Sequence, residues 1–156
     1  MEILISEYKK HYLNEYSTFT YKDLSDQLGT FLAAGHDTTA SLLSFTLFHI
    51  LQKENRNVYK KLQAEADAVF NDFKTNTDQE FTYKHVNRLE YTKVVLKETL
   101  RIDTPGPIIA RETSKSDTLP NGVHIPKGTS LWIAMALLHS DKNKWNDVDK
   151  FIPERF

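Results

Sequence analysis

The chain has 156 residues, a length typical of one domain, and its 20 Lys and Arg against 21 Asp and Glu give a formal net charge of -1. A charge so close to neutral excludes an extended basic surface for nucleic acid as the default interpretation. The chain contains no cysteine, which excludes disulfides, thiolate-ligated metals and a cysteine nucleophile within these residues.

The N-terminal part is predicted to contain a short helix with a loop over 1–19 and then one long helix over 20–53. Thr20 and Asp23 form a capping-box pattern at the start of the long helix. From Leu28 onward this helix is apolar on nearly every side, which predicts burial within a larger protein. Its Asp37 excludes a membrane span, since a charge at bilayer depth costs roughly 3 kcal/mol.

Residues 55–102 are predicted to be helical and 108–133 to form a small sheet. Thr104-Pro105-Gly106-Pro107 separates the two, because proline cannot continue a helix. The Asn121-Gly122 pair predicts a hairpin with a two-residue loop. With 134–156 as a short apolar piece and a polar loop, the fold class is mainly α with a small β-sheet.

An acid and a hydroxyl stand next to a glycine in the apolar part of the long helix, in the stretch Ala34-Gly35-His36-Asp37-Thr38-Thr39. Buried polar groups are costly, and a glycine in a helix interior costs about 1 kcal/mol relative to alanine. Close approach by a ligand would explain both costs. Hydrogen bonds from Asp and Thr to their own backbone are the structural alternative, and the residues alone leave both open.

Two further motifs are uninformative when taken singly. Glu98 and Arg101 share a helix face at i, i+3, which is commonly a surface ion pair worth about 0–1 kcal/mol. The last six residues, FIPERF, read as an aromatic-flanked turn with a charge pair.

In this order, however, the three motifs resemble the cytochrome P450 superfamily of haem-thiolate monooxygenases. AGHDTT is similar to the motif of the family's central helix, KETLR to its Glu-x-x-Arg helix, and FIPERF to the segment before its haem-ligand loop. LEYTKVVLKETLR, IPKGT and HSDKNKW agree, so the resemblance covers 20–156. It implies one partial domain over 1–156 with the cytochrome P450 fold.

The resemblance also implies roles around haem b. Asp37 and Thr38 would be the catalytic acid–alcohol pair that delivers protons to dioxygen. Ala34 and Gly35 would lie against the haem, and Arg111 would bind a haem propionate.

The remaining roles concern substrate and structure. The implied structural ion network, which braces the haem-ligand loop, consists of Glu98, Arg101 and Arg155. The implied substrate pocket is lined by Ala33, Thr39, Ile108, Ile109 and Ala110. These small or apolar side chains favour an apolar small molecule, such as a fatty-acid-like substrate.

The implied parent protein takes electrons from NAD(P)H through a flavin reductase or a ferredoxin. No metal ligand is assigned in this chain: the axial Cys is expected beyond Phe156, and His36, His124 and His139 lack paired spacing. The chain alone is therefore expected to be inactive. Localisation stays open between the cytoplasm and membrane anchoring on the cytoplasmic side.

Two alternatives to the enzyme remain. The chain could be a truncated, non-catalytic paralogue that binds or dimerises through its long apolar helix. It could also be a helical scaffold without a cofactor, in which the three motifs are incidental.

Overall fold

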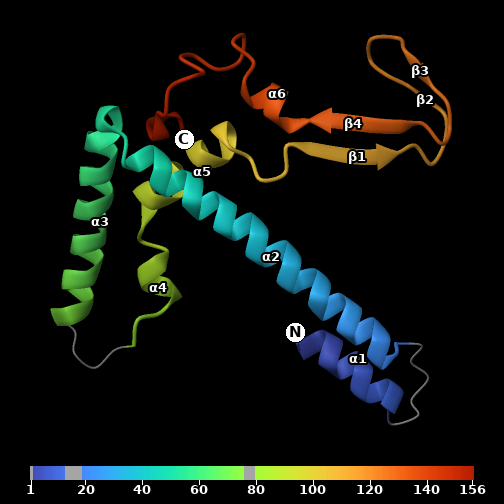
Figure 1. Ribbon diagram of the computed structural model, residues 1–156, viewed down its shortest axis with the longest axis horizontal. Coiled ribbons are helices and arrows are strands. Elements are labelled where there is room, and N and C mark those ends of the chain that lie inside the picture. The colour runs from blue at the N-terminus through green and yellow to red at the C-terminus, as the bar shows by residue number, and fades with distance from the viewer. Residues whose placement is uncertain (1, 13–18, 76–79) are drawn as a thin grey trace. The chain divides into compact units, whose positions relative to one another are not determined.

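The computed structural model describes residues 2–12, 19–75 and 80–156 (Figure 1). The helices are α1 (Glu2–Tyr12), α2 (Tyr21–Ile50), α3 (Arg56–Thr75), α4 (Tyr83–Val86), α5 (Glu90–Ile102) and α6 (Met135–His139), with 3-10 helices η1 (Lys53–Asn55) and η2 (Pro153–Arg155). The strands are β1 (Ile108–Glu112), β2 (Asp117–Thr118), β3 (His124–Ile125) and β4 (Ser130–Ala134). The predicted fold class, mainly α with a small β region, is confirmed.

The chain divides into two compact units, 1–40 and 41–156, with the boundary inside α2. In the first unit the predicted capping box is present: Asp23 accepts a hydrogen bond from the Thr20 amide at 2.8 Å, and Thr20 Oγ1 accepts one from the Asp23 amide at 3.2 Å. Tyr8 of α1 packs edge-on against Tyr21, with ring centroids 6.1 Å apart. Residues 29–40 of α2 are all exposed. Among the described residues, no helix combines the length and the apolar character that crossing a membrane requires.

The long helix ends at Ile50, three residues before the end that the sequence predicts. Gln52 adopts an extended backbone, with φ -64° and ψ 146°, which breaks the helical hydrogen-bond ladder. The carbonyl of His49 accepts from the Gln52 amide at 3.2 Å and from the Asn55 side chain at 2.9 Å. A local side-chain bond therefore satisfies this helix end, and the chain turns into η1 and α3.

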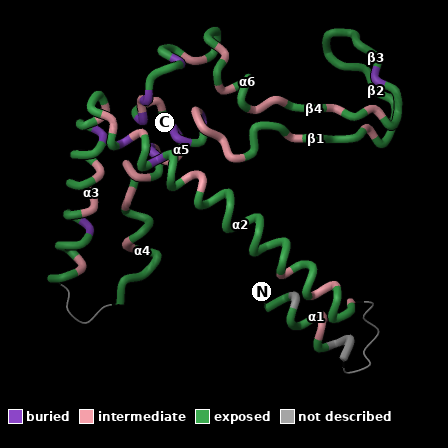
Figure 2. Tube along the Cα trace, viewed as in Figure 1, coloured by how far each residue is buried: buried purple, intermediate pink, exposed green. Residues whose placement is uncertain are grey.

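The core of the second unit lies where α2, α3 and α5 meet the last residues of the chain. Figure 2 shows buried segments concentrated at α5 and near the C-terminus. His49 stacks in parallel on Phe151 with ring centroids 4.7 Å apart. The buried apolar cluster consists of Ile50, Val58, Val95 and Phe151, flanked by Leu62, Tyr91 and Ile102.

The β region consists of two antiparallel pairs, β1 with β4 and β2 with β3 (Figure 1). Within the first pair, Ile108 lies opposite Ala134 and Glu112 opposite Ser130. The smaller pair is inserted between these two strands in the sequence. Its short strands pair over two residues each.

The hairpin between β2 and β3 lies at the predicted position, but its loop has three residues and the two-residue prediction is wrong. Leu119 and Val123 flank it: the Leu119 amide donates to the Val123 carbonyl at 2.9 Å, and the Gly122 amide donates to the Leu119 carbonyl at 2.8 Å. Pro120 occupies the turn position that its fixed φ suits, and Gly122 has φ +85°. Proline thus makes this a three-residue turn in which glycine supplies the left-handed position.

Candidate functional site

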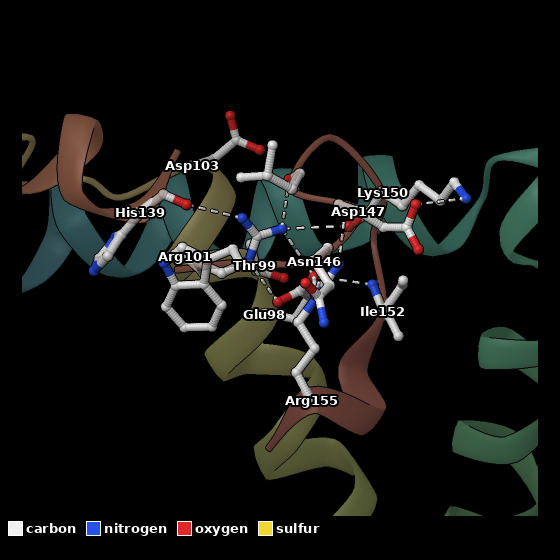
Figure 3. Close-up of polar contacts among 12 residues, drawn as sticks. Glu98, Thr99, Arg101, Asp103, His139, Asn146, Asp147, Lys150, Ile152 and Arg155 are labelled. Carbon is white, nitrogen blue, oxygen red and sulfur yellow. Dashed lines mark hydrogen bonds and ion pairs between the residues drawn. The ribbon is translucent and has the colours of Figure 1, made fainter. Parts of the chain in front are cut away.

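A fully buried ion pair lies on α5. The Glu98 side chain is 0% exposed and that of Arg101 3%, and they are one helical turn apart. Arg101 donates from Nε to Glu98 Oε2 at 2.8 Å and from Nη2 to Oε1 at 3.0 Å, as Figure 3 shows. This two-pronged geometry is the strong form of a guanidinium–carboxylate contact.

Arg101 also binds the last residue of α6 and the segment that follows it. Its guanidinium donates to the carbonyls of His139 and Val148, both at 3.0 Å, and to that of Lys150 at 3.2 Å. The Trp145 ring lies against it, 5.3 Å from centroid to Cζ. Arg101 therefore ties a long irregular segment to α5 with its charge fully hydrogen-bonded.

A second arginine, Arg155 of η2, reaches the same carboxylate. Its Nε donates to Glu98 Oε1 at 3.2 Å, and its terminal nitrogens donate to the carbonyls of Asn146 and Asp147 (Figure 3). The Ile152 amide also donates to Glu98 Oε1, at 2.9 Å. One buried carboxylate thus accepts from two guanidinium groups and one backbone amide, and we call Glu98, Arg101 and Arg155 the Glu98 network.

Two polar contacts beside the network join α2 to α5. The hydroxyl of Thr46 lies 3.1 Å from that of Thr99, which is completely buried. His49 Nε2 lies 2.6 Å from an oxygen of Asp103, the C-cap residue that follows α5. Neither contact was predicted, because each joins residues more than fifty positions apart.

The N-terminus of α5 is held by Glu65 of α3. Glu65 Oε1 accepts from the Tyr91 amide at 2.6 Å, and Oε2 accepts from the Thr92 amide at 2.9 Å and the Thr92 hydroxyl at 2.8 Å. Burial alone would raise the pKa of Glu65, but these hydrogen bonds outweigh it and hold the pKa below its ordinary value.

Lys61, one turn earlier on α3, pairs with Glu154 of η2 at 2.6 Å. The Tyr91 hydroxyl donates to the same carboxylate at 2.8 Å. The hydrogen bond from Lys61 is the main cause that lowers the pKa of Glu154. Burial, followed by the contact with Glu154, raises the pKa of Tyr91. The FIPERF segment is therefore attached to α3 as well as to α5.

The predicted catalytic pair lies on the exposed part of α2 in the first unit. The Thr38 hydroxyl donates to the Ala34 carbonyl at 2.6 Å, and Asp37 Oδ1 lies 3.0 Å from His36 Nδ1. No hydrogen bond is found between Asp37 and Thr38 themselves in the described structure. A Cβ added at Gly35 would meet no atom within 4 Å, so this face of the helix is open.

The other predicted site residues lie along β1 and on α2. Ile109 of β1 is half-buried, and Ile108 and Ala110 are exposed. Arg111 is exposed and donates from Nη1 to the Ala110 carbonyl at 2.8 Å. Ala33 and Thr39 are exposed on α2.

A metal site is not evident in the described residues, which contain no group of three or more His, Asp or Glu arranged to hold an ion. His139 Nδ1 is buried without a hydrogen-bond partner there. The His139 ring faces Trp145 edge-on, 6.5 Å between centroids.

Comparison with known proteins gives a match along the whole chain. The family model described as Cytochrome P450 matches residues 1–156.

Individual relatives carry the same family name. Cytochrome P450 3A5 of Homo sapiens is 39% identical over 92% of this chain and 28% of its own length. Cytochrome P450 monooxygenase alt2 of Alternaria solani is 36% identical over 86% of this chain and 26% of its own length. The bifunctional cytochrome P450/NADPH–P450 reductase 2 of Bacillus subtilis is 38% identical over 89% of this chain and 12% of its own length. The chain thus spans between an eighth and somewhat over a quarter of these relatives.

Proposed function

Because this chain belongs to the cytochrome P450 family, we propose that the protein containing it is a haem-dependent monooxygenase. Such an enzyme inserts one oxygen atom from O2 into an organic substrate. The observation that carries the proposal is the Glu98 network: a buried carboxylate shared by two arginines, one from α5 and one from the FIPERF segment.

The residues of this chain fit haem at its periphery. Arg111 is exposed and uses one of its nitrogens on Ala110, so further N–H donors can bind the carboxylate of a propionate. The open face at Gly35, with Ala34 beside it, leaves room for a flat ring system. The chain has no cysteine, so these residues would hold the cofactor without ligating its iron. When bound, haem supplies the redox chemistry that activates dioxygen.

The proposed proton path uses Thr38 and Asp37. The Thr38 hydroxyl donates its hydrogen to the Ala34 carbonyl. Its Oγ1 atom can still accept a hydrogen bond from another donor. Delivery of a proton requires this hydroxyl to turn its hydrogen from Ala34 toward the reacting oxygen. In the proposal, Asp37, the exposed carboxylate immediately before Thr38 in the sequence, replaces that proton from solvent.

The Glu98 network contributes rigidity to the proposed enzyme. It fixes the backbone of Ile152 and the side chain of Arg155 to α5 through a single carboxylate. In the proposed enzyme this fixed segment supports the haem-ligand loop. Breaking one contact of this buried network would leave a charge without its partner, which costs free energy. Conformations of the segment that break these contacts are therefore disfavoured.

The proposal extends to substrate and electrons. The exposed Ile108 and half-buried Ile109 of β1 support an apolar small-molecule substrate, since they offer hydrocarbon surface for binding. Two relatives, from Bacillus subtilis and Gibberella moniliformis, are named as bifunctional cytochrome P450/NADPH–P450 reductases. Their names support NADPH, acting through a reductase, as the electron source.

A ferrous–CO difference spectrum of the purified full-length protein tests the proposal. We expect a Soret band at the position of thiolate-ligated haem, together with O2-dependent consumption of NADPH when a reductase is added. Failure of the full-length protein to bind haem would overturn the proposed function.

A further inference from the structure

We propose that Glu65 is a positioning residue: by capping α5 from α3, it sets where α5 presents Glu98 to Arg155. This inference deepens the proposed function and rests on it for its haem readout. Its structural part stands on contacts within the second unit alone.

The start of α5 has no cap of its own. A helix begins with amide groups that lack intrahelical partners, and Ser, Thr, Asp or Asn usually satisfies one of them. The residue before α5 is Leu89, whose side chain forms no capping hydrogen bond. The amides of Tyr91 and Thr92 donate instead to Glu65, 26 and 27 positions away.

A carboxylate suits this place better than other side chains. Its two oxygens accept three hydrogen bonds here, two from amides and one from the Thr92 hydroxyl. Its negative charge also lies at the positive end of the helix dipole. Glutamine has the same shape but offers one acceptor oxygen, so it can retain only part of the contact.

The cap bears on Glu98 through the geometry of the helix. Glu98 follows Tyr91 by seven residues, which is about two turns, so both lie on one side of α5. An anchor at Tyr91 therefore fixes the rotation of α5 and its position along its own axis. Both decide where the Glu98 carboxylate meets its partners.

The same helix, α3, also holds the other side of the network. Lys61 lies one turn before Glu65 and pairs with Glu154, the neighbour of Arg155. Its ammonium lies 5.4 Å from the centroid of the Tyr91 ring, whose hydroxyl also donates to Glu154. One face of α3 thus contacts both segments that bring charges to the Glu98 network.

The test uses the full-length protein with Glu65→Gln and Glu65→Ala, and Asp67→Asn as the matched control. Asp67 is an exposed acid on the same helix, so its replacement removes one charge without touching α5. Hydrogen–deuterium exchange is resolved to single amides at Tyr91, Thr92 and Ile152, and the ferrous–CO spectrum is recorded for each variant.

In Glu65→Gln we expect amide exchange at Tyr91 and Thr92 to be roughly tenfold faster, because a charge-assisted hydrogen bond is lost. The Ile152 amide, which donates to Glu98, should also lose protection. The haem spectrum should show a smaller share of the thiolate-ligated form in Glu65→Ala than in Glu65→Gln, a partial rescue by the conservative change. Asp67→Asn should match the wild type.

Unchanged protection at Tyr91 and Thr92 in Glu65→Gln would overturn the cap. Faster exchange there with unchanged Ile152 protection and an unchanged spectrum would overturn the positioning role. If Glu65→Ala does not fold, Glu65→Gln alone decides. If the wild type binds no haem, the proposed function fails, and the three amides still decide whether Glu65 positions the network.

Discussion

Glu98 accepts from the side chains of Arg101 and Arg155 and from the Ile152 amide while being completely buried. A buried ion is expensive to desolvate, and its partners must satisfy it in full. The two arginines are satisfied in turn by five backbone carbonyls, those of His139, Asn146, Asp147, Val148 and Lys150. Through these two arginines, the single carboxylate of Glu98 contributes to holding the whole segment from α6 to η2 against α5.

Glu98→Gln should reduce the free energy of unfolding by about 3–5 kcal/mol, because two guanidinium groups lose their buried counter-charge. Urea unfolding followed by circular dichroism measures the change. Glu90→Gln on the same helix is the control, since Glu90 is exposed and pairs with Lys93 at the surface. It should change stability by less than about 1 kcal/mol. Equal effects of the two changes would contradict the proposed role of the network.

Thr38→Ala in the full-length protein should uncouple NADPH consumption from product formation, since the proposed proton donor is lost. The ratio of product to NADPH measures the effect. Thr38→Ser should restore the ratio because it keeps the hydroxyl. Thr30→Ala is the control: Thr30 also donates to the carbonyl four residues earlier on α2, so it matches the helical context. Full coupling in Thr38→Ala would rule out the relay.

The pH dependence of stability should reveal Glu65. Burial raises its pKa, but the hydrogen bonds from Tyr91 and Thr92 bring it below the ordinary value of 4.5. As pH falls below about 4.5, the unfolded state binds a proton first, so the free energy of unfolding decreases until the folded carboxyl is also protonated. Melting temperatures between pH 7 and pH 3 should fall less steeply in Glu65→Gln. Parallel curves for the two proteins would contradict this expectation.

At the level of elements, local sequence pattern predicted the start of α2 better than its end. Thr20 and Asp23 lie three residues apart and form the capping box as expected. The end of α2 was predicted less well, because the Gln52 backbone and the Asn55–His49 bond decide it. Periodicity alone does not contain that information, since the apolar pattern continues past the end of the helix.

The hairpin loop depends on the left-handed backbone of Gly122. Gly122→Ala should destabilise it by about 1–2 kcal/mol, because a Cβ disfavours positive φ even where space is open. Exchange of the Leu119 amide, which donates across the loop, measures the change. Gly106→Ala is the control, as it also has open space but no positive φ, and should be nearly neutral. Equal exchange in both variants would mean that the loop tolerates the Cβ.

At the level of the whole chain, the exposed apolar side chains of α2 stand out. Leu32 is 74% exposed, Phe31 61% and Leu47 56%. Single exposed apolar residues are ordinary, but several along one helix are typical of a surface that another protein segment covers. In the proposed enzyme the rest of the protein covers them, whereas in the alternative of a dimerising module a second copy does.

Sedimentation velocity on the 156-residue chain separates these two cases. We expect concentration-dependent association without a defined stoichiometry, reduced by the double change Leu32→Lys and Leu47→Lys. Lys22→Gln, also exposed on α2, is the control and should not alter association. A defined dimer that melts cooperatively would favour the module over a part of a larger core.

The sequence by itself determined the features that depend on residues close together in the chain. The order of its motifs determined the family. The sequence predicted the helices, the small β region, the i, i+3 pair of Glu98 and Arg101, and the family. The roles given to Asp37, Thr38 and Arg111 stay predictions.

Apart from the pairing of Glu98 with Arg155, which the family resemblance implied, only the tertiary structure decided which distant residues meet. It brought the Ile152 amide to Glu98 across 54 positions, Thr46 to Thr99 across 53, and Glu65 to Tyr91 across 26. Sequence periodicity reports which face of an element is apolar, but it does not report which other element that face meets. Hydrogen bonds between elements depend on how the core packs, and that packing is a property of the folded chain.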